Sequence, residues 1–315
     1  MNYRIASFIF VVLMSAAYAQ LHAVRHDPAP HTQQLLQQAR TAIGAMNLQS
    51  LSAKGKVRRR VKYVEVSSLT KVEEKEKELT SKLRLEFVWP NKFRVREKGT
   101  QLNGLGYEFL SIVNDREAWV YPQPIVPSTP ENRRVVSVED AEQTMIRQAQ
   151  IARANVSRFT LSWLLSSWPT WPMEFNYAGR INTEAGSNDV LSIRDREGFK
   201  TLLLLDPQTH LPTMLNETIV LPQRIPVIPT GFGFDRRYNR AIMTKAREER
   251  QARTKPAQPV SIQMRLSERR LVNGLNLPHR ITTYHNGMEV ETIEFDEIEI
   301  NQPIHPKKFE EKRPR

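Results

Sequence analysis

The sequence predicts a mostly β protein of the α+β class, in which an antiparallel sheet with one apolar face packs against a few amphipathic helices. Two observations support this prediction. Strand-like stretches with an apolar period of two follow one another at short intervals along most of the chain. In addition, Asn273-Gly274 and Asn286-Gly287 are the dipeptides that favour tight hairpin turns between antiparallel strands.

The composition is that of a globular protein without thiols. The chain has 315 residues, with 46 Lys and Arg against 34 Asp and Glu, a net charge of +12 and no cysteine. The absence of cysteine excludes a disulfide scaffold, a cysteine nucleophile, a cysteine-ligated zinc site and an iron–sulfur centre. A mean hydropathy of -0.50 argues against a protein that crosses a membrane many times.

The N-terminus has the order of a secretory signal peptide. Arg4 precedes an apolar run over residues 5–14, and Ala17-Tyr18-Ala19 supplies the small-x-small cleavage pattern. We expect residues 1–19 to be a cleavable signal peptide of a periplasmic protein. An uncleaved anchor is the alternative, although the run is shorter than the roughly 20 residues that cross a bilayer. In the periplasm, the excess of basic over acidic residues favours binding to anionic membrane surfaces or anionic ligands, and we expect no nucleic acid as partner.

The first half of the chain predicts one helix and then a sheet. After a flexible lead over residues 20–31, apolar residues recur at helical spacing from Thr32 onward. Strands are expected at 53–66, 82–89, 92–97, 107–113 and 118–121, with the charged run 71–78 as a solvated hairpin end. Along the second strand, large apolar residues alternate with Arg84 and Glu86, which predicts one apolar and one solvated face.

The second half predicts another helix and another set of strands. The helix covers 138–158 and continues into an aromatic segment, 159–172. Strands are expected at 173–180, 190–194, 199–205, 211–221, 260–272, 277–284 and 288–300. We therefore expect one domain over residues 32–301, interrupted by a basic insertion at 224–258 and followed by a polar tail at 302–315.

Two ordered segments resemble the LolA/LolB-like family of periplasmic lipoprotein carriers. Residues 82–95 (KLRLEFVWPNKFRV) are similar to that family's strand, Pro-x-x-Phe and strand element. Residues 114–122 (NDREAWVYP) are similar to its next element, an Asp turn followed by Trp-x-Tyr and a proline loop. Residues 202–212 and 272–281 resemble later strands of the broader outer-membrane lipoprotein-sorting group, so the resemblance spans most of the chain.

The resemblance implies a strongly curved, incompletely closed antiparallel β-barrel. Helices would cover its open side, and an apolar cavity for acyl chains would lie between helices and sheet. The sequence departs from the family at Trp89, which stands where LolA proteins carry an arginine that helps to latch their lid helices.

Aromatic and aliphatic residues are the candidates for a ligand cavity and its lid, because a lipid chain needs apolar walls and indole is favoured at membrane interfaces. The segment 159–172 is either a lid at the cavity mouth or a buried helix end, and the aromatic strand residues are either cavity wall or plain core. The candidates are Leu85, Phe87, Trp89, Phe93, Phe109, Trp119, Tyr121, Phe159, Trp163, Leu164, Trp168 and Trp171.

The basic insertion is a second candidate surface. It is either a solvated or disordered excursion or a docking site for anionic lipid headgroups. The residues expected to dock are Arg236, Arg237, Arg240, Lys245 and Arg247. The run Arg58-Arg59-Arg60 is expected to lie on the solvated face of its strand.

The sequence carries no local enzyme signature, so we expect no catalytic residue, no metal and no cofactor. The expected function is that of a monomeric periplasmic carrier. It would sequester lipoprotein acyl chains or another lipid and deliver them toward the outer membrane, with an anionic membrane surface or a membrane donor or acceptor complex as further partner. The alternatives are an envelope sensor or interaction module of the same fold and, with less support, a lipid hydrolase.

Overall fold

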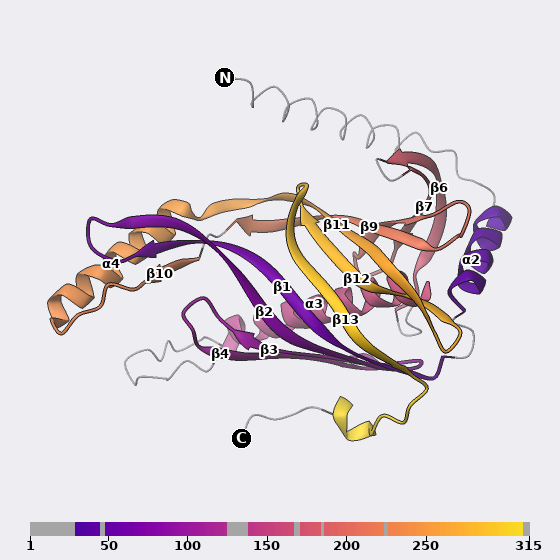
Figure 1. Ribbon diagram of the computed structural model, residues 1–315, viewed down its shortest axis with the longest axis horizontal. Helices are drawn as coiled ribbons and strands as arrows, with labels where there is room; N and C mark the ends of the chain where they lie inside the picture. The colour runs from indigo at the N-terminus through magenta and orange to yellow at the C-terminus, as the bar shows by residue number, and fades with distance from the viewer. Residues whose placement is uncertain are drawn as a thin grey trace.

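Thirteen strands form one curled sheet in the computed structural model, which describes residues 29–44, 48–124, 138–166, 171–183, 186–223 and 226–310 (Figure 1). The strands on the main path, in the order in which they pair, are β5 (Glu117–Pro124), β4 (Gly106–Asn114), β3 (Lys92–Thr100), β2 (Val72–Val88), β1 (Ser50–Val66), β13 (Met288–Ile300), β12 (Leu275–His285), β11 (Lys255–Val272), β9 (Pro212–Gln223), β8 (Lys200–Leu205), β7 (Gly186–Arg194) and β6 (Glu174–Thr183). A short strand, β10 (Val227–Pro229), lies parallel to the end of β1.

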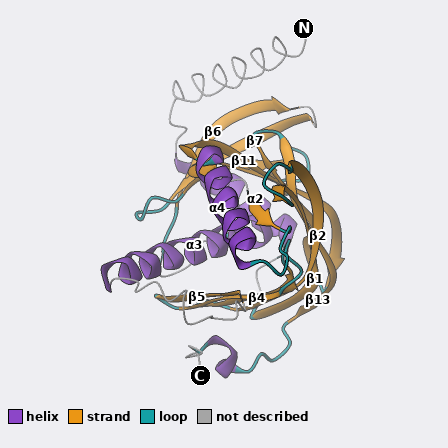
Figure 2. Cartoon of the chain, turned by 90° about the vertical axis from the view of Figure 1, so that its left-hand side faces the viewer, coloured by secondary structure: helices purple, strands orange, loops and turns teal. Residues whose placement is uncertain are grey.

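The sheet is antiparallel along this path and does not close. Its edges are β5 and β6, which do not pair with each other within the described strands. Figure 2 shows the strands following a curve that stays open on one side, as expected when strands with a right-handed twist approach closure. The predicted fold class, an incompletely closed antiparallel barrel with helices, is therefore confirmed.

Strict alternation gives the sheet an inner and an outer face. On β1, Val57 faces inward with its neighbours Ser81 on β2 and Ile293 on β13, while the flanking Lys56 and Arg58 face solvent. The turns predicted from sequence are present: Asn273 and Gly274, like Asn286 and Gly287, have positive φ between the last three strands. The inner face therefore follows directly from the apolar period of two.

Two helices cover the inner face. The long helix α3 (Val138–Leu164) lies inside the curve of the sheet (Figure 2), and its residues Val156, Phe159 and Trp163 join the main core. The helix α2 (Ala29–Ile43) packs with Leu161 of α3 and with Leu165, just after that helix, against β7, β8 and β9. These helices bury the apolar side of the sheet, as the hydrophobic effect requires.

A close backbone contact fixes the end of α2. Gly44 follows the helix with φ of 81°, and a Cβ at that position would lie 2.2 Å from the carbonyl oxygen of Gly274. Only glycine combines this backbone conformation with this approach. The end of α2 is thereby seated on the β11–β12 turn.

The first hairpin extends beyond the rest of the sheet and carries its own small core. Its far end packs against α4 (Arg236–Arg253), where Ile242 and Ala246 contact Val64 and Val66 of β1 (Figure 1). One expectation is corrected here, because residues 72–78 of the charged run lie within the ladder of β2 and are not the hairpin end. Residues 236–253 of the basic insertion form a helix, with Asp235 as its N-cap and an apolar side that the hairpin buries.

The segment expected as a polar tail docks on the outer face in part. The 3₁₀ helix η3 (Pro306–Phe309) buries Phe309 against Leu110 and Ile112 of β4. Lys308 adds an ion pair with Glu86, with Nζ 2.6 Å from Oε1. Residues 1–28, which hold the expected signal peptide and most of the expected flexible lead, lie outside the described residues, and residues 29–31 of that lead are the start of α2. No helix in the described part is both long and apolar enough to span a bilayer.

Candidate functional site

A partly open cavity of about 790 Å³ lies between the inner face of the sheet and α3. Cavities of about 300–1,000 Å³ are the size at which proteins hold small molecules. Its apolar walls come from α3 and from strands β1 to β4, β9 and β11 to β13. They are Val57, Leu83, Leu85, Phe93, Val95, Phe109, Phe159, Ile219, Ile262, Met264, Ile281, Ile293 and Phe295.

The apolar and polar parts of the wall are separated along the strands. On β13 the order is Glu291, Ile293 and Phe295, so the carboxylate comes first and the aromatic ring last. On β3 the same order runs in reverse, from Phe93 to Glu97. Because β3 and β13 run antiparallel to each other, Phe93 and Phe295 lie toward one end of the cavity and Glu97 and Glu291 toward the other, where Phe109 lies opposite Glu97. The cavity therefore has an apolar interior and a charged rim.

Arg59 is the centre of that rim. Its guanidinium donates two hydrogen bonds to the Glu97 carboxylate, one of them 2.9 Å long from Nη2 to Oε2, and a third of 2.6 Å from Nε to Oε2 of Glu291. Ser81 donates from Oγ to Oε1 of Glu97 at 2.5 Å, and the Tyr107 hydroxyl donates to the same oxygen. One cation thus joins two carboxylates that come from β3 and β13.

The hydrogen bonds of this cluster determine the protonation states of Glu97 and Tyr107. Burial would raise the pKa of the Glu97 carboxyl, but the hydrogen bonds from Arg59, Ser81 and Tyr107 hold that pKa below its usual value. Burial and the bond to Glu97 both raise the pKa of the Tyr107 hydroxyl. Glu97 is therefore ionised and Tyr107 protonated at neutral pH.

A second ion pair lies where α3 crosses the cavity. Arg158 donates to both oxygens of Glu217 on β9, with Nε 2.9 Å from Oε1 and Nη2 2.7 Å from Oε2. A third bond runs from Nη1 to Oδ1 of Asn155 at 3.0 Å. This two-pronged geometry is the strong form of the arginine–carboxylate pair. It fixes the helix to the sheet beside the cavity.

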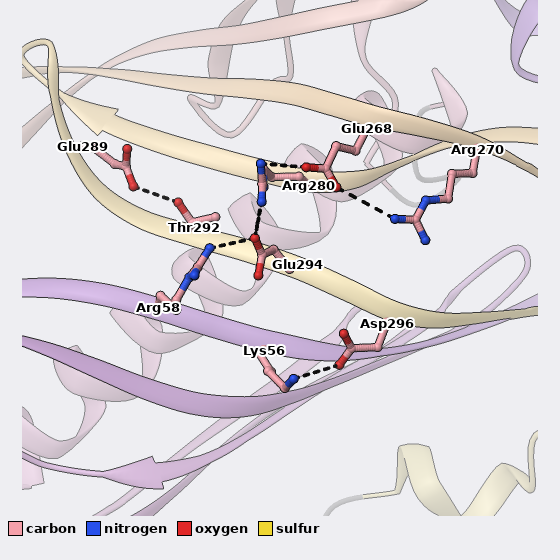
Figure 3. A network of polar contacts seen from close by, with 9 residues as sticks. All are labelled: Lys56, Arg58, Glu268, Arg270, Arg280, Glu289, Thr292, Glu294 and Asp296. Carbon is pink, nitrogen blue, oxygen red and sulfur yellow. Dashed lines mark hydrogen bonds and ion pairs between the residues drawn. The ribbon is translucent and has the colours of Figure 1, made fainter.

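The outer face carries a different kind of charge arrangement, shown in Figure 3. Glu294 accepts from Arg58 at 2.7 Å and also from Arg280, which in turn contacts Glu268 at 2.6 Å. These are cross-strand pairs among partly exposed side chains, and such pairs contribute little each. The charged side chains of the outer face are thus paired with one another, whereas the inner face lines the cavity.

Four of the residues proposed from sequence lie in the cavity wall. Leu85, Phe93 and Phe109 project from β2, β3 and β4, and Phe159 projects from α3. The rings of Phe93 and Phe159 are 5.2 Å apart between centroids. The structure thus brings these four together.

Four further candidates, one from β2 and three from the end of α3 or beyond it, lie in the packed core beside the cavity. Phe87, Trp163, Leu164 and Trp171 all belong to the main buried cluster, and Trp163 is completely buried between Phe159 and Phe295. Of the two interpretations of segment 159–172, the described residues of its first part fit the buried helix end. Trp168 lies outside the described residues, and the partly exposed Trp89 does not line the cavity.

Trp119 and Tyr121 require a correction. Their register on β5 places them opposite Ile112 and Leu110 of β4, on the outer face of the sheet. There they pack around Phe309 of the C-terminal 3₁₀ helix. The expectation that they line the cavity is wrong, because an edge-strand aromatic can be covered from outside by a segment distant in sequence.

The basic candidates all lie on α4, away from the cavity wall. Arg236, Arg237, Arg240 and Arg247 are exposed. Lys245 is half-buried and pairs with Glu249 at 3.1 Å, four residues along the helix.

Sequence reasoning missed the charged rim. Arg59 was expected on the solvated face with Arg58 and Arg60, yet it faces the cavity because it is two residues from the buried Val57. The alternation of side chains along a strand could have placed both residues of the rim on the inner face. Arg59 is two residues after Val57, and Glu97 is two residues after Val95. Nothing local marks Arg158 or Glu217, which meet only in the fold. The described residues contain no group of His, Asp and Glu side chains that could hold a metal ion.

Solved structures that are similar in fold to the chain include two that cover most of its length. One is a LolA superfamily protein from Nitrosomonas europaea, with 12% identity, 89% of this chain and 97% of that chain covered, and a TM-score of 0.44. The other is an outer membrane lipoprotein-sorting protein domain from Vibrio parahaemolyticus, with 9% identity, 90% and 97% coverage, and a TM-score of 0.45. No family model matches the sequence, and neither does any curated protein. Function is therefore inferred below from the cavity.

Proposed function

We propose that the protein is a non-enzymatic periplasmic carrier that holds the acyl chain of a lipid or lipoprotein in the cavity and delivers it toward the outer membrane. The observation that supports this proposal is the cavity itself. Its interior is lined by aliphatic and aromatic side chains, and Arg59, Glu97 and Glu291 lie together at one end. An acyl chain with a polar headgroup has the same division.

Burial of the chain supplies the binding free energy. Each methylene group removed from water contributes about 0.8 kcal/mol, so ten buried methylenes contribute about 8 kcal/mol before the costs of ordering. That gross figure corresponds to micromolar affinity. Specific polar contacts are not needed for affinity, and the rim around Arg59 and Glu97 sets the position of the headgroup.

Filling the cavity tests the proposal. Val95 is half-buried in the wall, and Val95→Trp places an indole in the space that the chain would occupy. The matched control is Val220→Trp, because Val220 is exposed on the other face of β9 from the lining residue Ile219. Uptake of a fluorescent fatty acid by the mature protein should fall at least tenfold in Val95→Trp and stay unchanged in Val220→Trp.

A milder variant keeps the test valid if the indole prevents folding. Ile293→Phe adds less volume to a partly buried wall position, and thermal unfolding identifies variants that remain folded. Equal uptake by the folded cavity variants and the wild type would overturn the proposal.

Transfer distinguishes a carrier from a sensor of the same fold. A carrier loaded with the fluorescent fatty acid should pass it to acceptor vesicles faster than the ligand leaves in their absence. Retention of the ligand at an unchanged rate would instead support an envelope sensor that binds lipid without transport.

A further inference from the structure

The loop before α4 holds two aromatic side chains in solvent. Phe232 is 52% exposed and Phe234 is fully exposed. The loop that carries them joins β10 to α4 beside the far end of the β1–β2 hairpin (Figure 1). Large apolar side chains exposed together in this way commonly mark an interaction surface.

The loop that carries them is anchored by backbone contacts. Thr230 donates its N–H to the Val66 carbonyl at 3.0 Å, and a Cβ on Gly231 would lie 1.7 Å from the Ser67 carbonyl oxygen. The Asn239 side chain holds Gly233 from both sides, accepting from its N–H at 2.8 Å and donating to its carbonyl at 2.7 Å. The loop is therefore fixed in a shape that leaves both rings outside the small core beneath it.

The adjoining helix carries a basic stripe on its solvent side. Arg236, Arg240, Met243 and Arg247 follow the spacing i, i+4, i+7 and i+11, which places them on one helical face, and all four are exposed. That face points away from Ile242, which packs against the hairpin.

The arginines of the stripe are available for an external partner. Arg236, Arg240 and Arg247 form no ion pair with a carboxylate in the described part of the chain, and neither does Arg237 beside them. By contrast, Lys245 and Arg253 on the same helix share Glu249. Glu249 is thus engaged by Lys245 and Arg253, and the stripe itself contains no acidic residue.

We propose that Phe232, Phe234, Arg236, Arg240, Met243 and Arg247, here called the docking tip, bind the surface of an anionic phospholipid bilayer. The arginines would contact lipid phosphates, and the aromatic rings and Met243 would enter the boundary between headgroups and acyl chains. Charge complementarity and exposed apolar side chains on one rigid element together favour a lipid surface, because each alone would bind only weakly.

The position of the docking tip also suits delivery. Arg59 on the cavity rim and Val66 below the tip lie on the same strand, about 23 Å apart along β1. Docking would bring the charged end of the cavity toward the membrane. This last point rests on the proposed carrier function, whereas binding of the tip to a bilayer does not.

Vesicle sedimentation with the mature, ligand-free protein tests the docking tip. The protein should bind vesicles that contain one third phosphatidylglycerol and should bind pure phosphatidylcholine vesicles far more weakly. Each arginine near an anionic leaflet accounts for about a fivefold change in affinity, so Arg236→Gln/Arg240→Gln/Arg247→Gln should lower affinity on the order of 100-fold. Phe232→Ser/Phe234→Ser should lower it about tenfold.

Matched controls separate the tip from general charge and hydrophobicity. Arg196→Gln/Lys200→Gln/Lys307→Gln removes three exposed cations elsewhere, and Leu271→Ser/Met288→Ser removes two exposed apolar residues near other hairpin turns. Both controls should bind like the wild type. Equal losses in a control and its matched tip variant, equal binding to both vesicle types, or tip variants that bind normally would each overturn the proposal.

The outcome is independent of the cavity. Val95→Trp should bind anionic vesicles like the wild type while losing fatty-acid uptake. A tip variant should show the reverse. Loss of vesicle binding in Val95→Trp, with thermal stability retained, would contradict the separation of the two surfaces.

Discussion

Replacing Arg59 with methionine should destabilise the protein much more than the same change one residue earlier. Arg59 donates two hydrogen bonds to Glu97, whose side chain is only 7% exposed, so water cannot replace them. A hydrogen bond to a charged group contributes about 1.5–3 kcal/mol. In the variant, Glu97 still accepts hydrogen bonds from Ser81 and Tyr107, and Arg59 itself is partly exposed. The expected loss in the free energy of unfolding is therefore near the lower limit for two such bonds, about 3 kcal/mol.

The matched control is Arg58→Met. Arg58 lies on the outer face and pairs with Glu294, and both side chains are partly exposed. Such a pair contributes below about 1 kcal/mol. Urea-induced unfolding of both variants, followed by tryptophan fluorescence, gives the two free energies of unfolding directly.

The effect of Arg59→Met should also depend on pH. In the wild type, the lowered pKa of Glu97 means that this carboxylate stabilises the fold at neutral pH, and that the contribution is lost as the pH falls through the lowered value. In the variant, burial is left to raise the pKa of Glu97 above the usual 4.5, so protonation relieves the unpaired charge. The deficit should therefore shrink from pH 7 to pH 5. An unchanged deficit, or one no larger than that of Arg58→Met, would refute this account of the rim.

Two further predictions concern the outer face. Glu86→Gln should lower the free energy of unfolding in urea by about 3 kcal/mol, because it leaves the buried Arg94 without a counter-charge. Glu76→Gln, in an exposed pair with Arg60, should lower it by less than about 1 kcal/mol. Similar losses in the two variants would contradict the burial argument. Phe309→Ala should lower the free energy of unfolding by about 3 kcal/mol because this ring is 1% exposed, and Phe234→Ala should change it by less than about 0.5 kcal/mol. If Phe309→Ala left the stability unchanged, the C-terminal 3₁₀ helix would not be docked in solution.

The sequence predicts the sheet well because alternation and turn chemistry are local properties. Leu85, Phe93 and Phe109 lie in the cavity wall because each occupies an apolar position of a period-two strand. The hairpin turns at Asn273 and Asn286 follow from residues that adopt positive φ. These features need no knowledge of distant contacts.

The remaining features depend on partners far away in the chain. Trp119 has the same chemistry as a cavity residue, but its register on β5 places it on the outer face, where Phe309 from the distant C-terminal segment packs against it. Arg158 meets Glu217 across 59 residues of sequence. The α4 helix was within reach of sequence reasoning, since Asp235 is a good N-cap and no glycine or proline interrupts residues 236–253. Its packing against the hairpin was not.

Photo-crosslinking with a diazirine-labelled fatty acid, followed by mass spectrometry of the digested protein, tests the central claim most directly. If the cavity holds the acyl chain, labels should fall on the inner-face segments around 83–95 and 291–295 and on α3 around Phe159, and excess unlabelled fatty acid should remove them. Labels confined to Phe232 and Phe234, or spread over the outer face without competition, would contradict the claim that this protein binds an acyl chain inside its sheet.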